Sequence, residues 1–113
     1  MQIKIFENTP FEEIFIIDFS LEERLYDTLP AKYNGKRLIT HCKIFVPEES
    51  SIIKDLVKRI GWGNATCAPL DKFSKARGRM IALYRAMHGA KLDRGTRLAI
   101  VEAIKEKGCK LWK

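Results

Sequence analysis

YNGKRLITHCKIFV, residues 33–46, is the stretch that decides the fold class of this chain. Its Asn34-Gly35 pair supplies the positive φ angles that a two-residue hairpin turn requires. The following residues alternate in polarity, which places Cys42 and Ile44 on one face of a strand and His41 and Lys43 on the other. We therefore predict an antiparallel hairpin whose second strand spans residues 36–46, with both faces partly covered.

The segments before this hairpin predict two further strands and a short helix. Residues 2–6 and 11–19 have strand patterns, and Asn8-Thr9-Pro10 separates them. At Ser20 the period changes, because Ser20 and Glu23 form a capping-box pattern and leucines follow at every fourth position. We expect a helix over residues 20–29 that ends before Pro30.

The second half of the chain predicts mainly helices. An amphipathic pattern after Pro47 predicts a helix over residues 50–60 with Gly61 as its stop, and residues 62–69 are expected to form a loop leading into a short strand. A long helix over residues 74–88 has the expected core stripe Ala76, Met80, Leu83, Tyr84 and Met87. Its opposite side has the small residues Gly78, Ala82 and Ala86, which allow another backbone to come close. Asp93 is expected to cap a last helix that runs to residue 107 and stops at Gly108.

These elements predict one α+β domain over residues 1–113: a small antiparallel sheet packed with three to four helices, two of them long and C-terminal. Apolar residues make up 46% of the chain, which is enough for a folded core. No apolar run is long enough to span a membrane, and no leader pattern precedes the domain. The three widely spaced cysteines, an odd number, favour reduced thiols. We expect an unprocessed cytoplasmic protein.

The net charge of +7 favours anionic partners such as nucleotides, nucleic acid, acidic proteins or anionic lipid. The cations concentrate in the second half, at Lys72, Lys75, Arg77, Arg79, Arg85, Lys91, Arg94 and Arg97. The common catalytic and phosphate-loop motifs are absent from the sequence, and the cysteines and histidines lack the spacing of a zinc module. We expect a non-catalytic binding protein without metal or cofactor.

The start of the long helix is the candidate site. Its first free amides, with Lys72 and Lys75 nearby, can hold a phosphate, and Phe73 can stack on a base. Alternatively, Asp71 or Ser74 caps the helix while Phe73 covers the core. In the last helix Arg97 falls inside the apolar arc, where it either snorkels, forms an internal ion pair or contacts a ligand.

The pattern ATCAPLDKF at residues 65–73, followed by Gly78-Arg79 and by Ala82, Leu83, Arg85 and Ala86, resembles small proteins encoded by tailed phages and prophages. Such proteins include counter-defence factors, among them anti-Thoeris sponges that enclose a cyclic ADP-ribose signal without cleaving it, and anti-CRISPR proteins. The sponge resemblance implies an α+β homo-oligomer in the host cytoplasm. It also implies an aromatic side chain on the adenine and arginines on the diphosphate, for which Phe73, Arg79, Arg85 and Arg97 are the candidates.

Two functions therefore follow from the sequence. The first, which the resemblance implies, is sequestration of an anionic, cyclic nucleotide signal by a phage-type counter-defence protein. The second is binding of DNA or RNA, or inhibition of a host-defence protein that binds nucleic acid, because the excess of positive charge over residues 72–97 exceeds what one diphosphate needs. An enzyme with an unfamiliar site is the third and least favoured interpretation.

Overall fold

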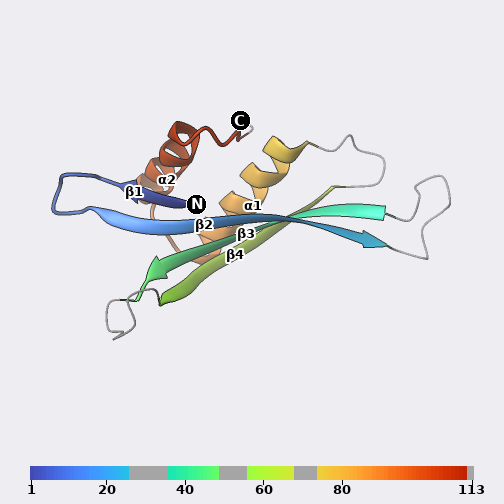
Figure 1. Cartoon of the computed structure of the whole chain (residues 1–113), viewed down its shortest axis with the longest axis horizontal. Helices are drawn as coiled ribbons and strands as arrows, with labels where there is room; N and C mark the ends of the chain where they lie inside the picture. The colour runs from blue at the N-terminus through green and yellow to red at the C-terminus, as the bar shows by residue number, and fades with distance from the viewer. Residues whose placement is uncertain (26–35, 49–55, 68–73, 112–113) are drawn as a thin grey trace.

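A computed structural model describes residues 1–25, 36–48, 56–67 and 74–111. The chain forms four strands followed by two helices (Figure 1). The elements are β1 (Gln2–Ile5), β2 (Glu13–Leu25), β3 (Lys36–Pro47), β4 (Val57–Cys67), α1 (Lys75–Gly89) and α2 (Arg94–Glu106). The α+β class is confirmed. The expectation of three to four helices is wrong for the described residues, which form two.

The four strands make one antiparallel sheet in the order β1-β2-β3-β4. β2 and β3 pair along most of their length, with Phe19 opposite Cys42 and Ser20 opposite His41. β1 pairs only with the beginning of β2, from Ile5 opposite Glu13 to Gln2 opposite Ile16. Among the described residues, the later part of β2, from residue 18 to 25, therefore has no strand on its outer side and is an edge of the sheet.

Both helices cover the same face of the sheet (Figure 1). α1 packs on β3 and β4, and α2 packs against β1. The side chains between them are buried and apolar, and they alternate along the strands as a half-covered sheet requires. The buried cluster contains Ile3, Ile5, Phe15, Ile17, Cys42, Ile44, Ala65, Ala82, Leu83, Ala86, Met87, Ile100 and Ile104.

α1 lies unusually close to the sheet because small residues face each other across the contact. A Cβ atom added at Gly63 would lie 2.8 Å from Cβ of Arg85, and one added at Gly61 would lie 3.0 Å from Cβ of Ala90. On the helix side, Gly78 touches Thr40, since a Cβ there would lie 2.5 Å from Oγ1 of Thr40. The predicted close approach of another backbone segment to the small-residue side of this helix is confirmed, and that segment is β4.

Three local predictions are wrong, and pairing with β3 explains all of them. Residues 20–25 were predicted to be helical but belong to β2. Residues 57–60 were predicted to end a helix but begin β4. Trp62, expected in a loop, lies within β4 opposite Lys43, and Gly61 is buried in the same strand instead of stopping a helix. The strand predicted over residues 11–19 exists but begins at Glu13. Leu56, also predicted to be helical, is described and lies just before β4 in no helix. Residues 26–29 and 50–55 of the predicted helices, and the Asn34-Gly35 turn, lie outside the described residues.

The two long helices are confirmed, together with their caps. Ser74 Oγ accepts a hydrogen bond from the Arg77 amide at 3.2 Å, and Asp93 Oδ1 accepts one from the Thr96 amide at 3.2 Å. Gly108 has a φ of +84° just after α2, as a helix stop requires. The predicted core stripe of α1 is wrong at Tyr84, which is 52% exposed. The helix buries its small-residue side together with Leu83 and Met87 instead.

Candidate functional site

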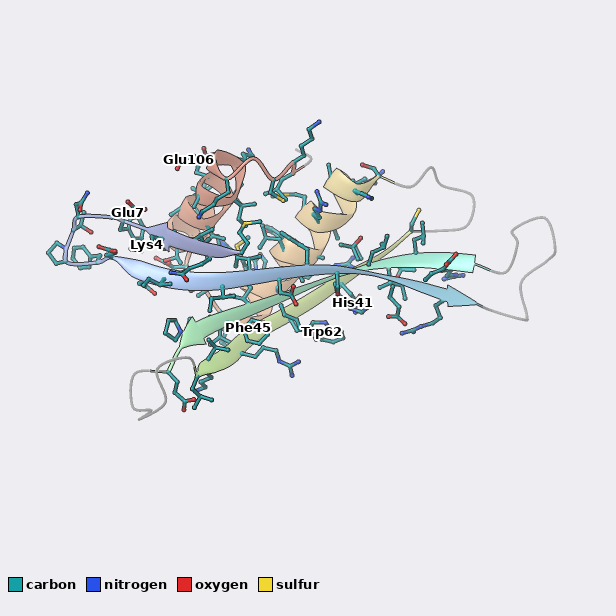
Figure 2. All side chains as sticks on the ribbon, in the orientation of Figure 1. Lys4, Glu7, His41, Phe45, Trp62 and Glu106 are labelled. Carbon is teal, nitrogen blue, oxygen red and sulfur yellow. The ribbon has the colours of Figure 1, made fainter. Side chains whose placement is uncertain are left out.

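The face of the sheet opposite the helices has an unusual combination of aromatic and basic side chains. We call it the open face and define it by His41, Lys43 and Phe45 of β3 with Arg59 and Trp62 of β4. Figure 2 shows His41, Phe45 and Trp62 on the side of the sheet away from α1 and α2. In the described part of the chain, the helices contact the opposite face. The open face is thus available to a partner.

Cross-strand register brings the members of the open face together. Lys43 lies opposite Trp62, and Phe45 lies opposite Arg59. The pairing skips Ile60, which is an irregularity that shifts the beginning of β4 by one residue relative to β3. Because of this shift, Arg59 joins Trp62 on the open face although three positions separate them. Strict alternation along an unbroken strand would have put them on opposite faces.

His41 and Trp62 form a stacked pair on this face. Their ring centroids are 6.0 Å apart and their planes differ by 14°, which is an offset stack. Trp62 is 49% exposed, although the apolar body of such a ring is favourably buried. The pair therefore presents a flat aromatic surface, already ordered, on which a further ring can stack.

A carboxylate fixes the orientation of His41. Nε2 of His41 lies 2.7 Å from Oε1 of Glu22 on the neighbouring strand β2. The other carboxylate oxygen of Glu22 accepts two hydrogen bonds from Arg24, at 3.0 Å from Nε and 2.8 Å from Nη2. The hydrogen bond with His41, followed by the one with Arg24, lowers the pKa of Glu22 below its ordinary value. The negative charge beside the stacked rings is thus already engaged by partners.

Two cations flank the stacked rings. Ser20, His41, Lys43, Arg59 and Trp62 line an open hollow of about 390 Å³, which we call the open-face hollow. Asp18 lies opposite Lys43 in the β2–β3 register, so the positive charge is strongest toward β4. A ring surface next to a lysine and an arginine can bind a planar base and the phosphate attached to it.

A second hollow lies on the helix side of the sheet. Phe19, Ser20, Leu21, Thr40, Lys75 and Arg79 line about 200 Å³ there, and we call this the helix-side hollow. Lys75 is exposed at the start of α1, and Arg79 is half-buried one turn later. Two cations over an apolar floor can hold a phosphate group.

The structure brings together only part of the site predicted from the sequence. Lys75 and Arg79 meet in the helix-side hollow. Arg85 donates from Nη1 to the backbone oxygen of Asn64 at 2.8 Å, so it ties α1 to β4. Arg97 donates from Nη1 to the ring of His88, 2.8 Å from Nε2. Neither Arg85 nor Arg97 lines either hollow, and Phe73 lies outside the described residues.

The cysteines add no site to the described part of the molecule. Cys42 is fully buried under the helices, and its neighbour His41 points to the open face, as strand alternation predicts. Burial, together with the nearby charge of Asp18, raises the pKa of Cys42 to about 12. None of the three cysteines forms a disulfide bond, and no group of three potential metal ligands comes together among the residues described.

The sequence contained a signal for the open face that the prediction of a loop at residues 62–69 obscured. Trp62, Asn64 and Thr66 alternate with Gly61, Gly63 and Ala65, which is the period of a strand with one small-residue face.

Comparison with protein-family models, with curated proteins and with solved structures gives no match. Neither described helix has the length and apolarity needed to cross a membrane. The geometry of the two hollows therefore carries the functional argument.

Proposed function

We propose that this protein binds single-stranded nucleic acid, without catalysis, on the open face of its sheet. The observation that carries the proposal is the stacked His41–Trp62 pair beside Lys43 and Arg59. Aromatic rings on which bases stack, flanked by cations that follow the backbone, are the recurring elements of single-strand binding surfaces. The net charge of +7 supports the same class of partner through long-range attraction.

Single strands fit this surface better than duplexes. The rings lie on the pleated surface of a sheet, where they can stack only on a base whose own face is free. In a duplex, neighbouring base pairs cover those faces. A helix that reads a major groove must protrude from the protein, whereas the two described helices pack against the sheet.

A second candidate function is sequestration of a small anionic nucleotide, the role that the resemblance to phage counter-defence proteins suggests. Lys75 and Arg79 support it, because they share one hollow with the apolar side chains of Phe19 and Leu21. The two functions differ in their salt dependence. For a single strand, log K falls with log salt with a slope of roughly −0.7 for each neutralised phosphate, so a strand gives a much steeper slope than a mononucleotide.

The decisive test compares the wild-type chain with Trp62→Ala by fluorescence anisotropy. The probes are labelled oligo-dT and oligo-rU of about 15 nucleotides, the upper range of such sites, a duplex of equal length and cyclic ADP-ribose as competitor. Base–aromatic stacking is worth about 1–3 kcal/mol per base, so the substitution should weaken single-strand binding by roughly 5- to 150-fold. Phe11→Ala is the matched control, since Phe11 is an aromatic residue 74% exposed and lies in the β1–β2 connection. It should leave the affinity unchanged.

A direct spectroscopic readout accompanies the affinities. The chain has two tryptophans, so in a Trp112→Phe background the fluorescence reports on Trp62 alone. Stacking of a base should quench it in step with the anisotropy. Single-strand affinities that are equal for wild type, Trp62→Ala and Phe11→Ala would refute the assignment of the open face. Tight, saturable binding of cyclic ADP-ribose with a shallow salt slope would favour the second candidate.

A further inference from the structure

The two hollows lie on opposite faces of the sheet, yet they share one residue. Ser20 of β2 lines both the open-face hollow and the helix-side hollow. It lies opposite His41 in the register, while its neighbours Phe19 and Leu21 face the helix side. The hollows are therefore neighbours across one strand, although a sheet separates their floors.

That strand is an edge at this point. β1 pairs with β2 only as far as Ile16, so in the part of the chain that the structure describes no strand lies outside Ser20. Ser20 is exposed, and so is Leu21 at 50%. A flexible chain can thus pass from one face to the other around the edge without disturbing a strand pair.

The far side of this edge is suited to phosphate. Lys75 and Arg79 are four residues apart on α1, so their side chains lie on the same side of the helix. Within the described residues neither forms an ion pair or a hydrogen bond, in contrast to Arg85 and Arg97, which are engaged. Two cations with no carboxylate partner among the described residues, above the side chains of Phe19 and Leu21, are available to attract an anion.

From these three observations we infer that a bound strand wraps around the β2 edge at Ser20. Its bases stack on Trp62 and His41 on the open face, and its backbone continues past Ser20. The phosphates that follow are bound by Lys75 and Arg79 on the helix side. This inference rests on the proposed function, and it adds a second contact region and a minimum length for the ligand.

The wrap makes affinity depend on strand length in a way that one face alone does not. A strand of about 5 nucleotides, near the small end of known site sizes, fills the open face only. A strand of about 15 nucleotides reaches both regions. The double variant Lys75→Gln/Arg79→Gln should therefore weaken the long strand at least about tenfold at low salt and leave the short strand within about twofold. Loss of two phosphate contacts should also reduce the magnitude of the salt slope for the long strand by about 1.4.

The control is Arg94→Gln/Lys110→Gln, which removes the same charge from exposed positions outside both hollows. It should change the two strands alike and only slightly. Arg79→Glu alone provides a second variant, and it should weaken the long strand selectively. Circular dichroism verifies that each variant is folded, and a variant that fails to fold is replaced by the other.

The outcomes separate the two claims. Loss of long-strand affinity in the Lys75/Arg79 variants, with short-strand affinity retained, supports the wrap. If Trp62→Ala weakens binding while the Lys75/Arg79 variants match the control on both strands, the open face binds the strand and the wrap is wrong. If Trp62→Ala has no effect on either strand, the proposed function itself fails. Equal weakening of short and long strands by the Lys75/Arg79 variants would also overturn the wrap.

Discussion

Gly63→Ala tests the close contact between α1 and β4, the strand that contributes Arg59 and Trp62 to the open-face hollow. The added methyl group would collide with the carbonyl oxygen of Ala82 and lie 2.5 Å from the amide nitrogen of Ala86. Both atoms belong to the backbone of α1, so no side-chain rotation can relieve the contact. The helix must move away from the strand.

The cost follows from what that movement exposes. Ala82, Leu83 and Ala86 are 0% exposed, and a displaced helix opens gaps beneath all three. Overpacking of a core costs about 1–3 kcal/mol, and backbone contacts that cannot yield place this case at the upper end, about 3 kcal/mol. With a urea m-value of about 1–3 kcal/mol/M, the midpoint should fall by about 1–3 M.

Urea titration followed by circular dichroism measures this change, with Gly95→Ala as the control. A Cβ at Gly95 would meet its nearest neighbour, Oδ2 of Asp93, at 3.8 Å, so alanine fits in α2 and should stabilise it by about 0.5–1 kcal/mol. Adding Ala82→Gly to Gly63→Ala should give no rescue, because the collision is with the backbone. A Gly63→Ala protein as stable as the wild type would refute the close-contact argument.

Two further predictions concern titrating groups. Burial raises the pKa of Cys42 to about 12, so iodoacetamide at pH 8 should modify Cys42 only after unfolding. In the native protein it should modify the half-buried Cys67 and Cys109, and peptide mass spectrometry identifies the labelled residues. Rapid labelling of Cys42 in the native protein would contradict this prediction. Hydrogen bonds from Thr96 lower the pKa of Asp93 in the folded state below its ordinary value of 3.8. The charged carboxylate therefore stabilises the folded state above pH 3.8, and this stabilisation is lost as the pH falls through the lowered pKa of the folded state. The stability advantage of wild type over Asp93→Asn in urea titrations should therefore shrink on acidification below pH 3.8, and an advantage independent of pH would exclude this role of the charge.

The errors of sequence-based prediction arose where two periodicities coincide. Leu21 and Leu25 are four residues apart, and such positions share a face in a strand as well as in a helix. Local chemistry favoured the helix through the Ser20–Glu23 capping pattern. Pairing of β2 with β3 along residues 16–25 outweighed it, because packing against cross-strand neighbours, which depends on tertiary context, decides strand formation more than local preference does.

The residues of the candidate site differ in how far their grouping depends on local sequence. Lys75 and Arg79 follow a helix start that Ser74 marks locally, so the sequence placed both residues correctly at the beginning of this helix. Trp62, His41, Lys43 and Arg59 belong to two strands, and their grouping depends on a register that includes a skipped residue. On the other face of β4, Gly61 and Gly63 contact α1 closely, and no short window of sequence contains both partners of that contact.

The sequence by itself determined the features that depend on near neighbours: the caps at Ser74 and Asp93, the stop at Gly108, the alternation of β3 and the excess of positive charge. Hydrogen bonds within one turn and the two-residue period of a strand act over a few positions, so a short window contains them. Only the tertiary structure decided which face the helices cover and which aromatic rings stay exposed. The covered face depends on close contacts between α1 and the glycines of β4, Gly61 and Gly63, which lie well before α1 in the sequence. Packing α1 on this face removes apolar surface from water, and this favours the observed arrangement.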